Sequence, residues 1–195
     1  MVLRLNTPLD GETARELRIG DRVELFGDIY AARDAAHKRM VELLAVGEDL
    51  PFDIRGAVIY YVGPTPPRPG RPIGAAGPTT SSRMDPYTET LLERGLRGMI
   101  GKGPRSQDVV QALARHGAVY FAATGGAGAL LADTIVESEV VAWPELGPEA
   151  LRRFSVEGFP AVVAVDAAGG DLYRIGPERY RARDKVLKMG DDTRE

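Results

Sequence analysis

The sequence predicts an α/β fold in which a mixed β-sheet is combined with several helices. Apolar runs typical of buried strands alternate with segments of helical periodicity through the middle of the chain. Hairpin-like apolar segments flank this alternation, and the two patterns together favour a layered α/β architecture. The 195 residues suffice for one large core, so we expect a single domain over residues 1–180 and a charged, frayed tail over 181–195.

The first third of the chain is expected to contain three strands and one helix. Residues 2–5 and 22–26 alternate apolar and polar side chains and predict strands, the second of which ends at Gly27. Apolar residues spaced three or four apart predict a helix over 32–45. Residues 57–62 are a continuous apolar run, as in a strand that is covered on both faces.

A proline-rich segment, residues 63–72, follows that strand. Proline fixes φ and removes a hydrogen-bond donor, so this segment cannot form regular structure. It is either a linker between two domains or an ordered loop within one. We favour the loop, because residues 1–62 hold too few elements for a separate core.

The remaining elements are predicted from the residues that begin and end them. Asp85, followed by proline, is expected to cap a helix that Gly95 closes, and Ser106 to cap a helix that Gly117 closes. A small-residue helix is expected over 128–132. Strands are expected at 97–100, 118–123, 135–142, 161–166 and 172–175.

Composition excludes several kinds of protein. A formal net charge of −3 gives no basic field of the kind that binds nucleic acid. The chain has no cysteine and only two histidines, His37 and His116, so we expect no disulfide, no thiolate nucleophile and no metal ligands from this chain. No apolar run is long enough for a signal peptide or a membrane span, and we expect a cytoplasmic protein with no membrane partner.

Two glycine-rich stretches fall short of nucleotide-binding motifs. A phosphate loop ending at Lys102 would need glycine at position 96 and a hydroxyl residue at position 103, where the chain has Leu96 and Gly103. A dinucleotide fingerprint starting at Gly126 would need its last glycine where the chain has Leu131. The sequence therefore does not support a nucleotide site.

The strongest candidate for chemistry is the run Gly77-Pro78-Thr79-Thr80-Ser81-Ser82-Arg83. A turn that starts at Gly77 and continues with hydroxyl residues presents backbone N–H groups and hydroxyls together, which suits an anion. Arg83 adds a planar guanidinium that fits a carboxylate with two hydrogen bonds. The alternative is a polar loop that caps a helix and leaves Arg83 exposed.

Two other cations and one histidine are further candidates. Lys102 lies between glycines at the end of a predicted strand, where α/β sheets bind ligands; the alternative is a surface turn. Arg33 lies near a helix start, where a cation opposes the helix dipole, and a residue placed against local preference is more often functional. The alternative is that Asp34 simply neutralises the charge of Arg33. His37, one turn later, is either part of a substrate site or a packed or capping residue.

Together these residues suggest a site for a small dicarboxylate, which needs a cationic clamp at each end. A threonine hydroxyl is a poor base at its ordinary pKa. It could act as a base only where neighbouring cations and dipoles stabilise its alkoxide.

Several segments, in order and spacing, resemble the β subunit of class I fumarase and L-tartrate dehydratase. They are Ala32-Arg33-Asp34-Ala35-Ala36-His37-Lys38-Arg39, Gly63-Pro64-Thr65-Pro66, Gly77-Pro78-Thr79-Thr80, Arg83-Met84-Asp85, Gly98-Met99-Ile100-Gly101-Lys102-Gly103, Tyr120-Phe121-Ala122-Ala123 and Phe159-Pro160-Ala161-Val162-Val163-Ala164-Val165-Asp166. The resemblance covers the chain from about Leu3 to Tyr173 and implies a swivelling β/β/α domain of three layers.

The resemblance also implies an activity and a division of labour. A [4Fe–4S] cluster would be held by cysteines of a separate α subunit, in a heterodimer or an α2β2 assembly, which agrees with the absence of cysteine here. The reaction would be reversible dehydration of a 2-hydroxy dicarboxylate, with fumarate/L-malate expected first and L-tartrate to oxaloacetate next. Arg33, Arg83 and Lys102 would bind carboxylates, Thr79 would remove the C3 proton, and Thr80 would support Thr79.

One residue departs from the pattern, and two other functions stay open. Asp28 stands where a small or hydroxyl residue is expected, and it either alters only a loop or tunes the charge of Arg33. The chain could instead be a non-catalytic carboxylate-binding module or a structural partner subunit. Presence of the full set of Arg33, Thr79, Arg83 and Lys102 favours the enzyme, because a degenerate module would be expected to lose one of them.

Overall fold

Five strands close on themselves in the computed structural model, which describes residues 1–191, with side chains described as far as Arg181. The sheet order is β1-β2-β3-β4-β5-β7-β6, and an additional pairing joins β2 to β7. Because β7 also pairs with β5, the strands β2, β3, β4, β5 and β7 form a ring. The strands are β1 Val2–Asn6, β2 Arg22–Ala31, β3 Val58–Tyr60, β4 Gly98–Gly101, β5 Val119–Ala122, β6 Ile135–Ala142 and β7 Leu151–Val165.

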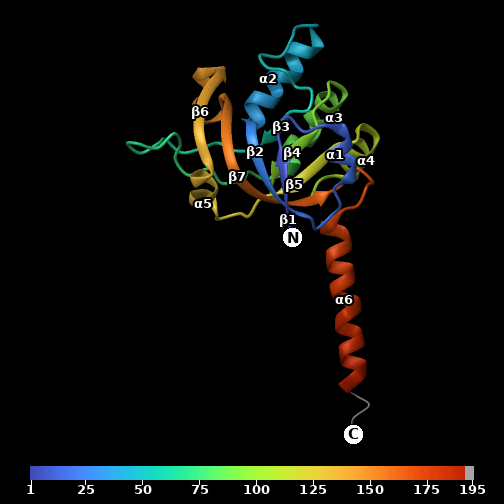
Figure 1. The fold of residues 1–195 in the computed structure, drawn as a ribbon. Coiled ribbons are helices and arrows are strands. Elements are labelled where there is room, and N and C mark those ends of the chain that lie inside the picture. Colours follow the sequence, from blue (N-terminus) through green and yellow to red (C-terminus); the bar gives the residue numbers. More distant parts are fainter. Residues whose placement is uncertain (192–195) are drawn as a thin grey trace.

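Strand directions divide this ring into two β layers. β1 to β5 run parallel to one another, whereas β7 is antiparallel to β2, β5 and β6. Helices α2, α3 and α4 pack on the outer face of the parallel layer and form a third layer, as Figure 1 shows for α3 and α4 beside β4 and β5. Helices α1 and α5 instead contribute to the core between the two β layers. The helices are α1 Gly11–Glu16, α2 Asp34–Ala45, α3 Asp85–Glu93, α4 Gln107–His116, α5 Gly128–Asp133 and α6 Leu172–Asp191, with 3₁₀ turns η1 Ser81–Met84 and η2 Pro144–Glu149.

Two apolar cores lie on opposite faces of the parallel layer. Tyr60 belongs to the core between the two β layers, together with Phe159 of β7. Its neighbour Tyr61 belongs to the core beneath the helices, together with Leu113 of α4. Successive side chains of a strand point to opposite faces, so an apolar run covered on both sides supplies both cores. The predicted α/β architecture with a mixed sheet in three layers is confirmed.

Local signals account for α4 more closely than for α3. Ser106 Oγ accepts the N–H of Val109 at 3.4 Å, and Gly117 closes α4 at a φ of 63°, as expected from the sequence. Helix α3 begins at Asp85 itself, so the prediction that Asp85 is its cap was one residue late. The Asp85 carboxylate instead accepts the N–H of Ser106 at 2.9 Å, a contact between two segments that local sequence does not reveal.

The proline-rich segment is a loop between neighbouring strands of one sheet. β3 precedes it and β4 follows it, and these strands pair directly with each other. At its base, the N–H of Thr65 donates to the carbonyl of Ala75 at 3.0 Å. The loop projects from the side of the body in Figure 1.

Several predicted boundaries were wrong. β2 does not stop at Gly27 but bulges near Phe26 and continues to Ala31, because Gly27 adopts a φ of 104° without leaving the sheet. β7 begins ten residues before the predicted strand at 161–166. The predicted strand at 172–175 is the start of α6, and α1 was missed.

Helix α6 leaves the body of the protein and includes residues 181–191 of the predicted frayed tail. It runs from Leu172 to Asp191 and points away from the sheets in Figure 1. Backbone from 181 to 191 is therefore helical, and the rest of the predicted frayed tail, residues 192–195, lies outside the described residues. Among the helices that the structure describes, α6 included, none is long and apolar enough to cross a membrane.

Candidate functional site

The predicted site residues gather where parallel strands end. Arg33 follows β2, the hydroxyl run enters the sheet after β3, and Lys102 follows β4. In an open or closed parallel layer the carboxyl ends of the strands share one edge, and ligands bind there. The topology thus brings together segments that are separated in the sequence.

The hydroxyl run is inserted between the diverging ends of β3 and β4. The N–H of Thr79 donates to the carbonyl of Tyr61 at 2.7 Å, and the carbonyl of Thr79 accepts the N–H of Lys102 at 3.2 Å. The N–H of Ser81 then donates to the carbonyl of Lys102 at 2.9 Å. Main-chain hydrogen bonds therefore hold Thr79, Thr80 and Lys102 in register, with Thr79 half-buried and Thr80 exposed.

A buried hydroxyl pair anchors this insertion from below. Ser81 Oγ lies 2.8 Å from the Tyr120 hydroxyl, which donates to the carbonyl of Gly103 at 2.8 Å. Burial raises the pKa of Tyr120, so the phenol keeps its proton and remains a donor. A Cβ at Gly101 would lie 1.9 Å from Ser81 Oγ, so the close approach of these two segments requires glycine at that position.

Arg33 and Arg83 meet at one carboxylate. Arg33 Nε lies 3.3 Å from Asp34 Oδ2, and Arg83 Nε lies 2.8 Å from Asp34 Oδ1. Glu149 of η2 adds a second acid, with its Oε1 3.1 Å from Arg33 Nη2. Asp34 does neutralise part of the Arg33 charge, as one alternative held, but it does so while bringing a second candidate cation into the same place.

Lys102 and Gly77 complete the surface. The Lys102 side chain is exposed and passes over Gly125, whose Cβ position would be 3.9 Å from Nζ. Lys102 forms no ion pair with the side chains that the structure describes as far as Arg181. Gly77 is exposed and its backbone packs against Gly128 at the start of α5. The site therefore has one charged amino group available to an incoming anion.

His37 lies beneath the cations. Its side chain is fully buried, Nδ1–H donates to the carbonyl of Arg33 at 3.0 Å, and its ring packs edge-on against Tyr61. Burial lowers the pKa of His37 to about 4, so the ring is neutral near pH 7. His37 is therefore packed in the interior, as one of the two alternatives held. Its ring does not reach the surface where the residues predicted to bind carboxylates lie.

Sequence reasoning missed the buried Arg105. Its side chain is 0% exposed, pairs with Asp85 at 2.6 Å and donates to Thr88 Oγ1 at 2.6 Å. These contacts fix the loop that carries Lys102 onto α3. Glu149 was also missed, because its partners Arg33 and Ala35 are more than a hundred residues away in the sequence and no local pattern connects them.

Asp28 does not act on Arg33. Its carboxylate accepts the Ser155 hydroxyl at 2.6 Å and lies 3.6 Å from Arg153 Nη1. Both partners belong to β7, which pairs with β2 at this point. Asp28 lies within β2 and reinforces a strand pairing, so neither the altered loop nor the tuning of Arg33 describes this residue.

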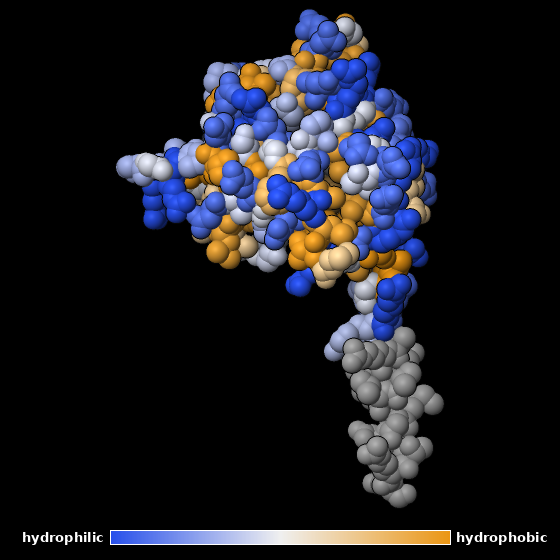
Figure 2. Space-filling view, in the orientation of Figure 1, coloured by the Kyte–Doolittle hydropathy of each residue, from blue (hydrophilic) through white to orange (hydrophobic). Residues whose placement is uncertain are grey.

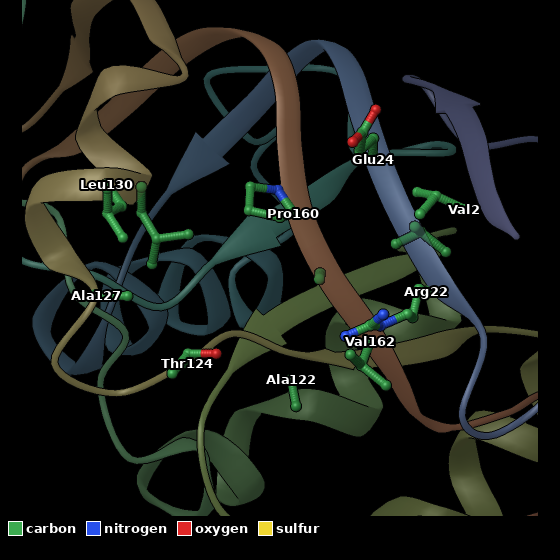
Figure 3. Close-up of a pocket in the computed structure, with 12 residues that line it drawn as sticks. Val2, Arg22, Glu24, Ala122, Thr124, Ala127, Leu130, Pro160 and Val162 are labelled. Carbon is green, nitrogen blue, oxygen red and sulfur yellow. The ribbon is translucent and has the colours of Figure 1, made fainter.

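A mainly apolar pocket of about 460 Å³ borders the segment of Gly125, through Thr124 and Ala127. Figure 3 shows Leu130 of α5 on one side of it, Val2 and Glu24 on the other, and Pro160 of β7 between them. Figure 2 shows apolar residues gathered toward the lower edge of the body, where Figure 1 places the N-terminus. The pocket contains none of the predicted site residues, so the candidate site is the cationic edge of the sheet and not this pocket.

Comparisons with known proteins show the family of this chain. The family model described as "Fumarase C-terminus" matches residues 1–176. The chain is 41% identical over 174 residues to "Fumarate hydratase class I, anaerobic" of Escherichia coli, covering 87% of this chain and 32% of that protein. It is 39% identical over 173 residues to "Fumarate hydratase 2" of Leishmania major, covering 87% of this chain and 30% of that protein.

A relative of similar length is also found. The chain is 36% identical over 188 residues to "Putative L(+)-tartrate dehydratase subunit beta" of Methanocaldococcus jannaschii, covering 93% of this chain and 96% of that protein. By contrast, it spans about a third of the length of the fumarate hydratases that it matches. The resemblance inferred from the sequence motifs is confirmed, and the chain belongs to the fumarase C-terminus family.

Proposed function

We propose that this chain is the β subunit of a two-subunit hydro-lyase that reversibly dehydrates a 2-hydroxy dicarboxylate. The observation that carries the proposal is the convergence of Arg33, Arg83 and Lys102 with the hydroxyl of Thr79 at one edge of the sheet. The relative of matching length, named as a tartrate dehydratase subunit beta, supports the division into subunits.

The [4Fe–4S] cluster that the family resemblance implies does not fit this chain as its holder. Thiolates are the usual ligands of such clusters, and this chain has no cysteine. Among the residues that the structure describes, no group of three or more His, Asp or Glu side chains could bind a metal ion either. We therefore assign the cluster to a cysteine-bearing α subunit and derive here only what this chain's own residues do.

The cations would bind and orient the two carboxylates of the substrate. Arg83 presents a guanidinium, which fits a carboxylate with two hydrogen bonds, and Lys102 presents a single compact charge. Removal of a proton from the carbon next to a carboxylate places negative charge on that carboxylate. Cations already in position stabilise this charge without rearranging, which is a main source of catalytic acceleration.

Thr79 is the proposed base for that proton. Its hydroxyl stands on a main chain held from both sides, by Tyr61 and by Lys102, so the backbone that carries the hydroxyl is in place before the substrate binds. Nearby positive charge favours the alkoxide over the neutral hydroxyl and lowers the free energy of forming it. Thr80 would support Thr79 from the exposed side of the same segment.

Two substrates fit this chemistry, and L-malate/fumarate is proposed before L-tartrate/oxaloacetate. The two hydroxy acids share two carboxylates and a 2-hydroxyl group, and they differ by one hydroxyl. The relatives named above carry both activities in their names. Groups that recognise the extra hydroxyl would lie on the α subunit, facing the edge that carries Lys102.

The test is anaerobic co-expression with a cysteine-bearing candidate α chain, sought among the genes next to this one, followed by ultraviolet assays with L-malate and L-tartrate. We expect turnover that requires both chains and is lost on exposure to oxygen. A cluster-loaded complex that binds dicarboxylates but converts neither acid would contradict the proposal and favour a non-catalytic carboxylate-binding module. A complex that binds none would favour a structural subunit.

A further inference from the structure

Asp34 connects the two arginines of the site through a single side chain. Its Oδ1 lies 2.8 Å from Arg83 Nε and its Oδ2 lies 3.3 Å from Arg33 Nε. The side chains of Arg33 and Asp34 are only 25% and 29% exposed, so water screens their contact less than it screens an ion pair on the open surface, whereas the Arg83 side chain is 49% exposed. One carboxylate thus holds together two cations that would otherwise repel each other.

The atoms that Asp34 uses leave the other edge of Arg83 available. Both contacts involve Nε, the inner N–H of the guanidinium. The closest Arg83–Asp34 pair is at Nε, and the two terminal nitrogens of Arg83 donate no hydrogen bond to the side chains described as far as Arg181. These terminal N–H groups form an edge that can bind a carboxylate with two parallel hydrogen bonds. Asp34 therefore contacts Arg83 from behind and not in the place of a ligand.

Arg33 is held on further sides. Glu149 Oε1 lies 3.1 Å from its Nη2, and Glu149 Oε2 accepts the N–H of Ala35 at 3.0 Å, in the first turn of α2. A Cβ at Gly63 would lie 2.9 Å from Arg33 Nη1 and 3.2 Å from its Cδ, so the side chain lies directly on the backbone of residue 63. Arg33 is thereby fixed in one position, and Asp34 holds Arg83 next to it through the second oxygen of its carboxylate.

We infer that Asp34 is a positioning residue that orients Arg33 and Arg83 before the dicarboxylate binds. A flexible charged side chain that is ordered in advance loses less entropy when its ligand arrives, so prior ordering increases affinity. The inference rests on the proposed function for the identity of the ligand, but it concerns a residue to which that proposal gives no role.

The first experiment measures binding without turnover. The probe is succinate, a dicarboxylate with no hydroxyl to lose, titrated into the complex with the α subunit. We expect Asp34→Asn to raise the Kd for succinate about tenfold, the loss of roughly one charge-assisted contact, and Asp34→Glu to recover most of it. The matched control is Glu42→Gln, which removes an exposed acid from the same helix, 3.8 Å from Lys38, and should leave the Kd unchanged.

Three results of that titration would overturn the inference. An unchanged Kd in Asp34→Asn together with a lower Tm would make Asp34 a helix-stabilising residue only. A lower Kd would mean that Asp34 occupies the carboxylate position and competes with the ligand. If the wild-type complex does not bind succinate, the site does not bind a dicarboxylate and Asp34 has no such ligand to prepare it for.

A second measurement separates this inference from the proposed function. Nitrogen-15 NMR of the full chain resolves arginine Nε–H groups, and the signals of Arg33 and Arg83 can be assigned from lysine variants. We expect Asp34→Asn to speed hydrogen exchange at both groups by about tenfold, and Glu42→Gln to have no effect. If exchange does not change, the positioning role fails whatever the enzyme does. If exchange and succinate affinity change as expected but the complex converts neither acid, only the proposed reaction fails.

Discussion

The carbonyl of Thr79 accepts a hydrogen bond from the backbone N–H of Lys102 at 3.2 Å. This main-chain contact joins Thr79, the proposed base, to Lys102, which is proposed to bind a carboxylate of the substrate. Two residues after Thr79, the N–H of Ser81 donates to the carbonyl of Lys102. Because the side chains of Thr79 and Lys102 take no part in these main-chain hydrogen bonds, substitutions at either residue should change chemistry while leaving the backbone in place.

Thr79→Ala is expected to abolish turnover and to leave assembly with the α subunit intact. Loss of a general base costs about a hundredfold to ten-thousandfold in rate, and the alanine variant has no hydroxyl to accept the proton. Thr79→Ser keeps the hydroxyl and should retain a measurable kcat. Steady-state rates and gel filtration of both variants provide the test, and a near-normal rate for Thr79→Ala would exclude Thr79 as the base.

Arg83→Lys is expected to raise KM for the dicarboxylate by about ten- to a hundredfold, although the positive charge is kept. Lysine cannot form two parallel hydrogen bonds with a carboxylate, and its single amino group cannot contact Asp34 and a substrate in the same way. The matched control is Arg94→Lys at the end of α3, which should leave KM unchanged. Equal KM values for wild type and Arg83→Lys would show that Arg83 does not contact the substrate.

Gly101→Ala is expected to lower the free energy of unfolding by about 1–3 kcal/mol or more, as overpacking does in a full core. The added Cβ would lie 1.9 Å from Ser81 Oγ and 2.9 Å from the Tyr61 ring. Gly77→Ala is the comparison, since the nearest atom to its Cβ would be at 3.7 Å, an ordinary contact distance. Urea unfolding of both variants measures the difference, and similar losses would contradict the close packing of Ser81 on Gly101.

The free energy of unfolding is expected to decrease as the pH is lowered, because of His37. The folded-state pKa of about 4 lies below the usual value of 6.5 as a result of burial, so the unfolded chain takes up a proton first as the pH drops. The contribution of His37 is therefore complete above about pH 6.5 and is lost as the pH falls toward 4, on the order of 3 kcal/mol in all.

His37→Gln should flatten that part of the pH dependence of the unfolding free energy. His116→Gln replaces the other histidine of the sequence and serves as the control, with the slope of the wild type expected to persist. Equal slopes for wild type and His37→Gln between pH 4 and 6.5 would show that His37 titrates normally in the folded protein.

Helices and strands with strong local signals were predicted well, and the others show what local signals lack. Helix α4 has both its serine cap and its glycine end in the sequence. Strand β7 was predicted only in its last part, because Gly158 and Pro160 interrupt the apolar pattern that would have revealed its first ten residues. Those residues are strand because β2 and β6 offer them hydrogen-bond partners on both sides.

The sequence by itself determined which chemistry is available here: hydroxyls at Thr79 and Thr80, cations at Arg33, Arg83 and Lys102, and no cysteine. It also determined that these residues follow strands, since alternation of side chains and turn residues are properties of adjacent positions. The resemblance to a known family rested on the same short segments, so the family could be inferred from the sequence without the tertiary structure.

Only the tertiary structure decided how those residues meet. It placed Asp34 between Arg33 and Arg83, brought Glu149 to the start of α2, and buried His37 beneath the cations. Contacts of this kind depend on which faces of distant segments pack together when the ring of strands closes. Periodicity within one segment says which face is apolar, but it does not say which other segment will cover it.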